Sequence, residues 1–134
     1  MDVLNVEYML GLVPVLLGYL PLTLQLAGVG MVLALILACL FAVVRVLGIP
    51  VLNQLTIVFI SFFRGTPLLV QMFMIYHGMG QFEFVRESVI WIVFKEAYWC
   101  ALIAFALNTA GYTSEILRGT IEQTPYGEIE AARA

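Results

Sequence analysis

Long apolar runs separated by short polar breaks dominate the chain. The longest stretch without a charged side chain extends from Tyr8 to Val44, and about 20 apolar residues are enough to cross the hydrocarbon core of a bilayer. We therefore predict a first membrane-spanning helix over about residues 18–44, with Pro21 near its start, where a missing backbone N–H does least harm. Gly28 and Gly30 inside this helix favour close packing against another helix, although membrane helices also tolerate glycine without such a role.

A polar break divides the next apolar region. Residues 51–63 are mostly apolar, the stretch Arg64-Gly65-Thr66-Pro67 interrupts them, and a further apolar run follows. A charge, a glycine and a proline are unfavourable at the centre of a bilayer unless protein or water covers them. We therefore predict that residues 51–63 lie near one interface. A second span is predicted over about residues 66–80, with Thr66 as its cap and Pro67 as its first helical residue.

Charged residues bracket a short apolar stretch between residues 78 and 96, a pattern typical of an amphipathic segment at the membrane surface. A third span is predicted over about residues 97–117, and the sequence after it is polar. Lysine and arginine favour the cytoplasmic side of membrane proteins. An outer N-terminus leaves Arg86 and Lys95 outside and is therefore preferred, because it places more basic residues in the cytoplasm: Arg45, Arg64, Arg118 and Arg133.

Three polar side chains of the third span share one helical face, which we call the polar face. Asn108, Tyr112 and Glu115 follow an i, i+4, i+7 spacing, and Gly111 beside them leaves room. One hypothesis is that the polar face lines a path for a solute, with Glu115 matched to a cationic group. The alternative is that Glu115 pairs with Arg118 one turn away and that Asn108 joins helices by hydrogen bonding. The spacing does not choose between them.

The polar break between residues 64 and 67 is a second candidate site. Arg64 could contact a substrate or act in gating, but an arginine near the cytoplasmic face commonly anchors to headgroups or backbone carbonyls. We therefore assign Arg64, Gly65, Thr66 and Pro67 to a structural or gating role. Gln71 would face the protein interior or a neighbouring helix. His77, the single histidine, has no partners at metal-ligand spacing, so we predict an interfacial residue and no metal site.

The polar tail carries a further helix-start signal. Thr124 and Pro125 read as cap and first helical residue, and Glu128 and Glu130 fall where acids complement the helix dipole. The predicted helix, residues 125–134, is shorter than the roughly 12–15 residues at which isolated helices become marginally stable. It therefore needs a surface to pack against. It is either a frayed interfacial end or a docking element for a cytoplasmic partner.

Composition agrees with a membrane protein and offers little to catalysis. The chain is 63% hydrophobic and 11% charged, whereas soluble domains are about half apolar and a quarter charged. Asp2 and Glu7 stand where a secretion signal would carry basic residues. Cys39 and Cys100 lie far apart and are predicted to be packing residues. The sequence contains no phosphate-binding loop and no recognisable catalytic set, so nothing favours an enzyme.

Two stretches in this order carry a family resemblance: FRGTPLLVQ (63–71) and ALNTAGYTSEILRGTIEQTPYGEIEAARA (106–134). They resemble the permease subunits of polar amino-acid ABC importers, most closely the arginine and histidine/lysine/arginine/ornithine permeases of Gram-negative bacteria. The resemblance covers the chain from about Gly18 onward. It implies an all-α, multi-pass protein of the bacterial inner membrane with a periplasmic N-terminus. Its fold would comprise three transmembrane helices of a type I ABC importer permease core, which has five in the family, plus interfacial helices.

The resemblance also implies partners and docking residues. In the family a periplasmic binding protein delivers the amino acid, two permease subunits form the path, and two ATP-hydrolysing subunits drive transport. ATP and magnesium would therefore bind the partner, and no cofactor is expected on this chain. The Glu-Ala-Ala of the family's coupling helix, which docks on the ATPase subunit, matches Glu130, Ala131 and Ala132, with Gly127 before it. The resemblance also assigns the polar face to the path of a basic amino acid such as arginine.

In the family the Glu-Ala-Ala continues into a glycine, an isoleucine and a Leu-Pro pair, and then into further spans, whereas this sequence ends at Ala134. The sequence is thus expected to be the N-terminal part of a five-span subunit, with the first half of a coupling helix. The resemblance implies a subunit of an ATP-driven importer. The alternatives are a small membrane assembly or interaction protein that transports nothing, or a truncated permease without function.

Overall fold

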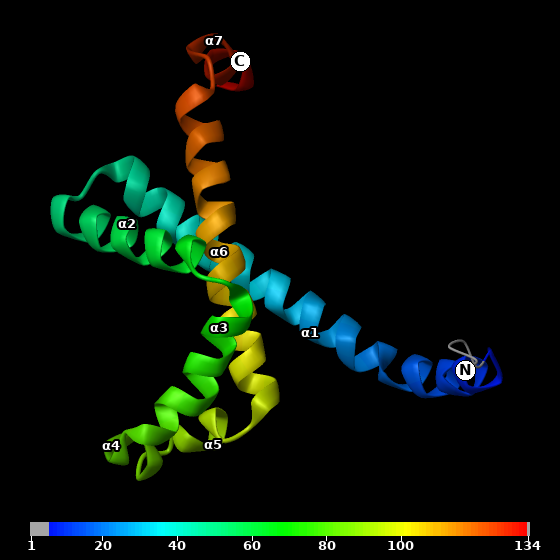
Figure 1. The fold of residues 1–134 in the computed structure, drawn as a ribbon. Coiled ribbons are helices and arrows are strands. Elements are labelled where there is room, and N and C mark those ends of the chain that lie inside the picture. The colour runs from blue at the N-terminus through cyan, green and yellow to red at the C-terminus, as the bar shows by residue number, and fades with distance from the viewer. Residues whose placement is uncertain (1–5, 134) are drawn as a thin grey trace.

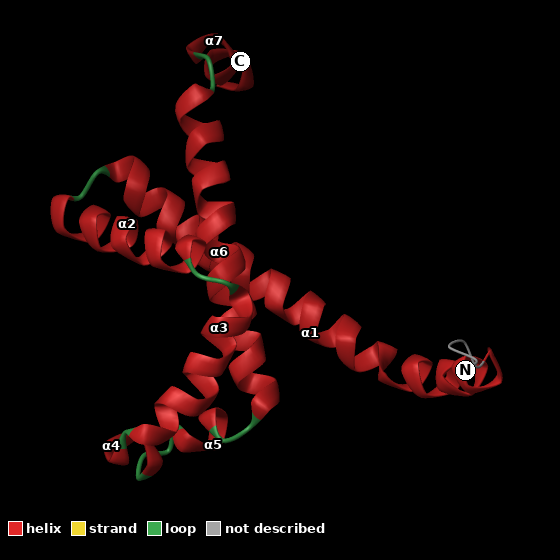
Figure 2. Ribbon diagram, in the orientation of Figure 1, coloured by secondary structure: helices red, strands yellow, loops and turns green. Residues whose placement is uncertain are grey.

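The computed structural model describes residues 6–133, and all regular structure in that range is helical, as expected for an all-α protein (Figures 1 and 2). The longest elements are α1 (Val6–Leu47) and α6 (Ala97–Gln123). The remaining helical segments, in chain order, are α2 (Pro50–Gly65), α3 (Leu68–Phe73), the π-helical turn η1 (Met74–Gly78), the 3₁₀ turn η2 (Met79–Gln81), α4 (Glu83–Arg86), α5 (Trp91–Phe94) and α7 (Tyr126–Arg133).

Helix α1 has 42 residues and extends beyond the predicted span at both ends. Pro21 lies inside the helix, not near its start, so that prediction was wrong; Pro14 is interior as well. Membrane-type helices accommodate interior prolines because neighbouring groups and small local adjustments satisfy the freed carbonyl. The helix ends at Leu47 because Gly48 has φ 64°, a left-handed conformation that glycine adopts at low cost.

The core of the molecule is the crossing of α1 and α6 (Figure 1). On α1 the contact face consists of small residues at every fourth position, all buried: Gly30, Ala34, Ala38 and Ala42. Such a stripe lets two helices approach closely, which is how helices associate in lipid. A Cβ atom added at Gly30 would lie 2.6 Å from Cδ1 of Phe105 on α6. The predicted packing role is therefore confirmed for Gly30. At Gly28 an added Cβ would meet nothing within 4 Å among the described residues, and its packing role stays a prediction.

The N-terminal half of α1 projects away from this crossing (blue in Figure 1). Between Tyr8 and Val29 every side chain is exposed except Leu26, which is partly buried. Large apolar side chains exposed around a whole helix are unfavourable in water and suit a lipid environment or a partner surface. By length and composition α1 and α6 can each cross a bilayer, and the bent pair formed by α2 and residues 68–81 would be a third crossing. Membrane crossing over residues 18–44, 66–80 and 97–117 stays a prediction.

A sharp turn separates α2 from α3. The axes of Pro50–Gly65 and Leu68–Gln81 differ by 109°, and we call the connecting residues 62–71 the elbow. Helix α3 begins at Leu68, with Pro67 in the cap position, so the prediction of Thr66 as cap and Pro67 as first helical residue was wrong. The hydroxyl of Thr66 donates instead to the carbonyl of Phe62, 2.9 Å away, and so completes the preceding helix.

The second predicted helix start failed for the same reason. Helix α7 begins at Tyr126, and Thr124 is the residue that caps the C-terminal end of α6. The Thr124 hydroxyl donates to the carbonyl of Thr120 at 2.9 Å. In both places a threonine that could cap the next helix bonds one turn backward, an option open to any threonine at a helix end. Helix α6 consequently extends to Gln123, beyond the predicted limit of residue 117.

Candidate functional site

Side chains complete the end of α2 at the elbow. The last four carbonyls of a helix have no N–H partner within the helix, and in an apolar environment each needs another donor. At α2 these carbonyls include those of Phe62, Phe63 and Arg64. Each of the three accepts a hydrogen bond from a side chain: the hydroxyl of Thr66, the amides of Gln71 and Asn108, and the hydroxyl of Tyr112, respectively.

Gln71 is the centre of this arrangement and is only 2% exposed. Its Nε2 lies 2.8 Å from the carbonyl oxygen of Phe63, 3.0 Å from that of Thr66 and 2.7 Å from the Thr66 hydroxyl. An amide nitrogen has two protons to donate, so these three acceptors use its full capacity. The sequence left the surroundings of Gln71 open. The structure places its side chain inside the protein, where it joins α3 to α2.

Two residues of the polar face reach the elbow from α6. Nδ2 of Asn108 donates to the carbonyl of Phe63 at 3.1 Å and to Oε1 of Gln71 at 3.2 Å. The hydroxyl of Tyr112 donates to the carbonyl of Arg64 at 3.1 Å. Gly111 lies between them, and a Cβ there would already be in van der Waals contact, 3.7 Å, with Cβ of Phe63. The elbow and α6 are therefore joined through hydrogen bonds that act on α2's terminal carbonyls.

The side chain of Arg64 also contacts Tyr112. Its guanidinium carbon lies 5.3 Å from the centre of the Tyr112 ring, a cation–π arrangement. Tyr112 thus holds Arg64 at two points, its hydroxyl at the backbone carbonyl and its ring at the side chain. Arg64 is exposed, and Tyr112 is 46% exposed.

Glu115, the third residue of the polar face, lies in an ion-pair cluster away from the elbow. Arg45, at the end of α1, places Nη1 3.0 Å from Glu115 Oε1, and Arg118 donates from Nε and Nη2 to Oε2 at 3.2 and 3.1 Å. Arg118 also pairs with Glu122. The pairing of Glu115 with Arg118, one of the two alternatives from the sequence, is present. The second partner, Arg45, was not foreseen.

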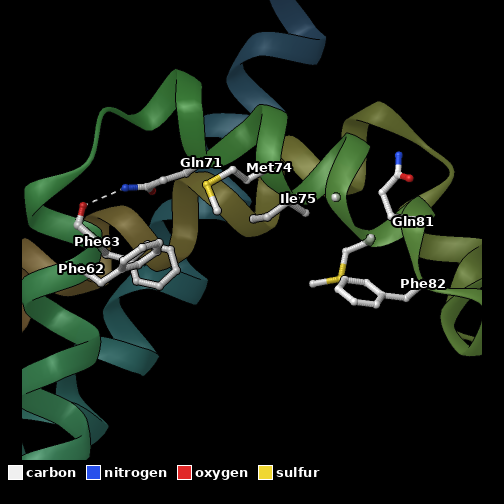
Figure 3. A pocket seen from close by; sticks show the side chains of 9 residues that line it. Phe62, Phe63, Gln71, Met74, Ile75, Gln81 and Phe82 are labelled. Carbon is white, nitrogen blue, oxygen red and sulfur yellow. Dashed lines mark hydrogen bonds between the residues drawn. The ribbon is translucent and has the colours of Figure 1, made fainter.

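An open apolar cavity of about 450 Å³ lies beside the elbow (Figure 3). Phe62 and Phe63 form one side, and Met74 and Ile75 lie opposite, with Gln71 between them and its bond to Phe63 drawn as a dashed line. The remaining lining residues are Gly78, Met79, Gln81 and Phe82. The cavity therefore borders the hydrogen-bonded junction directly, although its own surface is almost wholly apolar.

The proposed docking residues lie on α7, at the far end of α6 from α4 and α5 (Figure 1). Gly127, Glu130, Ala131 and Ala132 are all exposed, and an added Cβ at Gly127 would meet nothing within 4 Å. This helix has only eight residues. Its face is thus free to meet another molecule, although no contact in the described part of the chain tests that role.

The remaining single residues carry no site of their own. His77 stacks on Phe73, with ring centres 5.8 Å apart, and meets Tyr76 edge to face. Cys100 is buried and donates to the carbonyl of Phe94 at 3.3 Å, whereas Cys39 is exposed. Within residues 6–133 no three histidine, cysteine or carboxylate side chains gather as metal ligands would.

Comparisons with known proteins identify similar membrane transport proteins. Residues 30–134 match the family described as "Binding-protein-dependent transport system inner membrane component". The chain is similar to the octopine transport system permease protein OccM of Rhizobium radiobacter, with 50% identity over 119 residues that cover 89% of this chain and 49% of the relative. It is also similar to the arginine ABC transporter permease protein ArtM of Haemophilus influenzae, with 34% identity over 115 residues, 86% of this chain and 51% of the relative.

A solved structure has a similar fold. The crystal structure of an amino acid ABC transporter with histidines superposes with a TM-score of 0.78 at 27% identity, over 97% of this chain and 56% of the other. The chain spans about half the length of the curated relatives it matches. The family match over residues 30–134 includes the elbow, the polar face and α7.

Proposed function

Because the chain belongs to the family of binding-protein-dependent transport system inner membrane components, we propose that it acts as a membrane-spanning subunit of an ATP-driven amino-acid importer. The observation that carries this proposal is the family match over residues 30–134, which contains every polar group that the fold assembles around α6. The relatives are named as permeases, which agrees with the absence of catalytic motifs from the sequence.

The proposed substrates are basic amino acids and their derivatives. Similar proteins are named for octopine and arginine, compounds that each combine a guanidinium group with a carboxylate. In this proposal Asn108, Tyr112 and Glu115 lie along the path. Glu115 would receive a cationic group by exchanging it for Arg45 or Arg118, since both of its oxygens already face arginines.

The elbow is proposed to act as a fixed joint during transport. Arg64, Gly65, Thr66 and Pro67 form its turn, and side chains of α3 and α6 hold it through two successive carbonyls of α2, those of Phe63 and Arg64. Since losing these bonds together would leave carbonyls at the end of α2 without side-chain donors, α2, α3 and α6 would move together. Any rearrangement between inward-open and outward-open states would then occur outside this joint.

Partners complete the proposal. Helix α7 would dock on an ATP-binding subunit through Gly127, Glu130, Ala131 and Ala132, which are exposed at the end of α6. ATP and magnesium would bind that subunit and not this chain. A second permease subunit and a periplasmic amino-acid-binding protein would share the complex, with the N-terminus of this chain in the periplasm.

Charge reversal at Glu130 tests the docking role. Co-expression with a matching ATP-binding subunit is expected to yield a complex that survives purification through a tag on the ATP-binding subunit. Glu130→Lys should lower the recovered permease at least about tenfold, because an interfacial charge pair replaced by like charges loses more than about 1.4 kcal/mol. Quantitative immunoblotting of both subunits measures the ratio.

Glu83→Lys provides the matched control, since Glu83 is an exposed acid on α4 at the opposite end of α6 (Figure 1). This variant is expected to leave recovery of the complex unchanged. Full recovery with Glu130→Lys would remove α7 from the interface. If the unaltered chain captures no ATP-binding subunit at all, the interpretation as a non-transporting membrane assembly protein would be preferred.

A further inference from the structure

One cation of the helical core lacks an acidic partner. Arg45 and Arg118 each contact Glu115, and Arg118 also contacts Glu122. These two arginines and two glutamates sum to zero charge. Within residues 6–133, by contrast, no carboxylate lies within ion-pair distance of Arg64, whose guanidinium is held by the Tyr112 ring alone. Arg64 therefore contributes a net positive charge beside α6.

The position of Arg64 makes this charge informative. Tyr112, which it contacts, lies in the last part of the predicted span over residues 97–117, and Arg64 belongs to the polar break predicted near the cytoplasmic face. An arginine at such a position can face water, protein or an opposite charge. Arg64 is exposed on the surface of the described chain, so a group outside these residues can reach it.

Contacts with α6 also hold the side chain of Arg64 in position to bind such a group. The hydroxyl of Tyr112 donates to the Arg64 carbonyl at 3.1 Å, and the centre of its ring lies 5.3 Å from the guanidinium carbon. Arg64 packs beside α6 at Gly111, where an added Cβ would be in ordinary van der Waals contact, 3.7 Å, with Cγ of Arg64. The planar guanidinium of an arginine presents paired N–H groups, which can bind a carboxylate with two parallel hydrogen bonds.

We propose that Arg64, held by Tyr112, binds the carboxylate of the transported amino acid. This inference rests on the proposed function and deepens it: the group recognised here is the carboxylate, while the acid of the polar face, Glu115, is already neutralised by two arginines. The chemistry also explains why a path for basic amino acids would carry an unpaired arginine. A cationic side chain of the substrate would be repelled there, and its carboxylate end would be attracted.

The test compares L-arginine with agmatine, the amine that remains when the carboxylate of arginine is removed. The complete complex is purified in detergent without binding protein, and binding of radiolabelled arginine is measured with unlabelled agmatine as competitor. The unaltered complex should prefer arginine by about tenfold to a hundredfold, the range expected for charge-assisted hydrogen bonds. Arg64→Gln should abolish the preference, and Arg64→Lys, which keeps the charge without the paired donors, should retain part of it.

Further variants separate recognition from folding. Tyr112→Leu removes the ring and should reduce the preference more than Tyr112→Phe, which keeps the ring and loses only the hydroxyl. Arg86→Gln changes an exposed arginine on α4 and should leave the preference intact. These outcomes are ratios of two affinities, so a merely lower yield of protein does not alter them.

Two results would overturn the inference, and a third would also reject the proposed substrate class. An undiminished arginine preference in Arg64→Gln would show that the carboxylate binds elsewhere. Loss of complex assembly in Arg64→Gln, with the preference intact in what remains, would assign Arg64 to an acid of a partner subunit. Failure of the unaltered, intact complex to bind arginine or any other basic amino acid would reject the proposed substrate class and the role of Arg64 together.

Discussion

Replacing Gln71 by methionine isolates the hydrogen bonds of the elbow, because methionine has nearly the same length and shape as glutamine but neither donates nor accepts strongly. The change removes the amide donor of the Thr66 carbonyl and hydroxyl and the acceptor of the Asn108 amide. The carbonyl of Phe63 keeps its second bond, from Asn108 at 3.1 Å. Gln71→Met therefore leaves two partly buried groups, the Thr66 carbonyl and one Asn108 proton, without these partners.

The magnitude follows from the number of groups left unpaired. An unsatisfied buried polar group costs about 1–3 kcal/mol, and two such groups at the lower part of this range predict a loss of about 2–4 kcal/mol in the free energy of unfolding. The assay is unfolding of the purified protein in mixed micelles with increasing sodium dodecyl sulfate, followed by far-ultraviolet circular dichroism. The fitted free energies of variant and parent are then compared.

Gln81→Met is the matched control, since Gln81 is exposed on η2 and has no side-chain hydrogen bond within the described residues. It should change the free energy of unfolding by no more than about 0.5 kcal/mol, as surface substitutions usually do. A Gln71→Met variant as stable as Gln81→Met would refute the reasoning, because the junction would then owe nothing to the side-chain caps.

Two further predictions use the same unfolding assay. Gly30→Ala places a methyl group 2.6 Å from Cδ1 of Phe105, and such overpacking should lower the free energy of unfolding by about 1–3 kcal/mol. Gly28→Ala, with nothing within 4 Å, should be neutral or slightly stabilising. Equal effects of the two changes would contradict the assigned α1–α6 contact. Glu115→Gln removes the ion-pair partner of Arg45 and should lower the free energy of unfolding by about 1–3 kcal/mol, because the side chains of Arg45 and Glu115 are only 16% and 19% exposed. Glu122→Gln, at a side chain 50% exposed, should change it by less than about 1 kcal/mol. A larger loss of stability in Glu122→Gln than in Glu115→Gln would contradict the central role of Glu115 in the ion-pair cluster.

The helices could be predicted because their causes are local. The uncharged stretch from Tyr8 to Val44 predicted a spanning helix, and the glycine that follows it allowed the left-handed turn that ends α1. The residues at which helices begin and end could be predicted only approximately, because the sequence does not show which of two competing hydrogen bonds a threonine makes. A threonine before a proline can cap the next helix or bond back to the previous one, and at Thr66 and Thr124 the structure shows the second.

The candidate site was predictable only in part, for a similar reason. Asn108 and Tyr112 share a face because helical spacing requires it, and the Glu115–Arg118 contact is one turn of helix. The partners supplied by other elements depend on how helices cross. Arg45 reaches Glu115 because α1 packs along α6, and Gln71 turns inward because α3 leaves α2 at 109°. No local spacing encodes either event.

ATP-dependent uptake in proteoliposomes tests the central claim most directly. The complex containing this chain, its ATP-binding subunit and any second permease subunit is reconstituted with ATP inside the vesicles, and binding protein loaded with radiolabelled arginine is added outside. The account predicts accumulation of label above the outside concentration with ATP, and none with a non-hydrolysable analogue. An intact complex that hydrolyses ATP but accumulates neither arginine nor any other basic amino acid would contradict it.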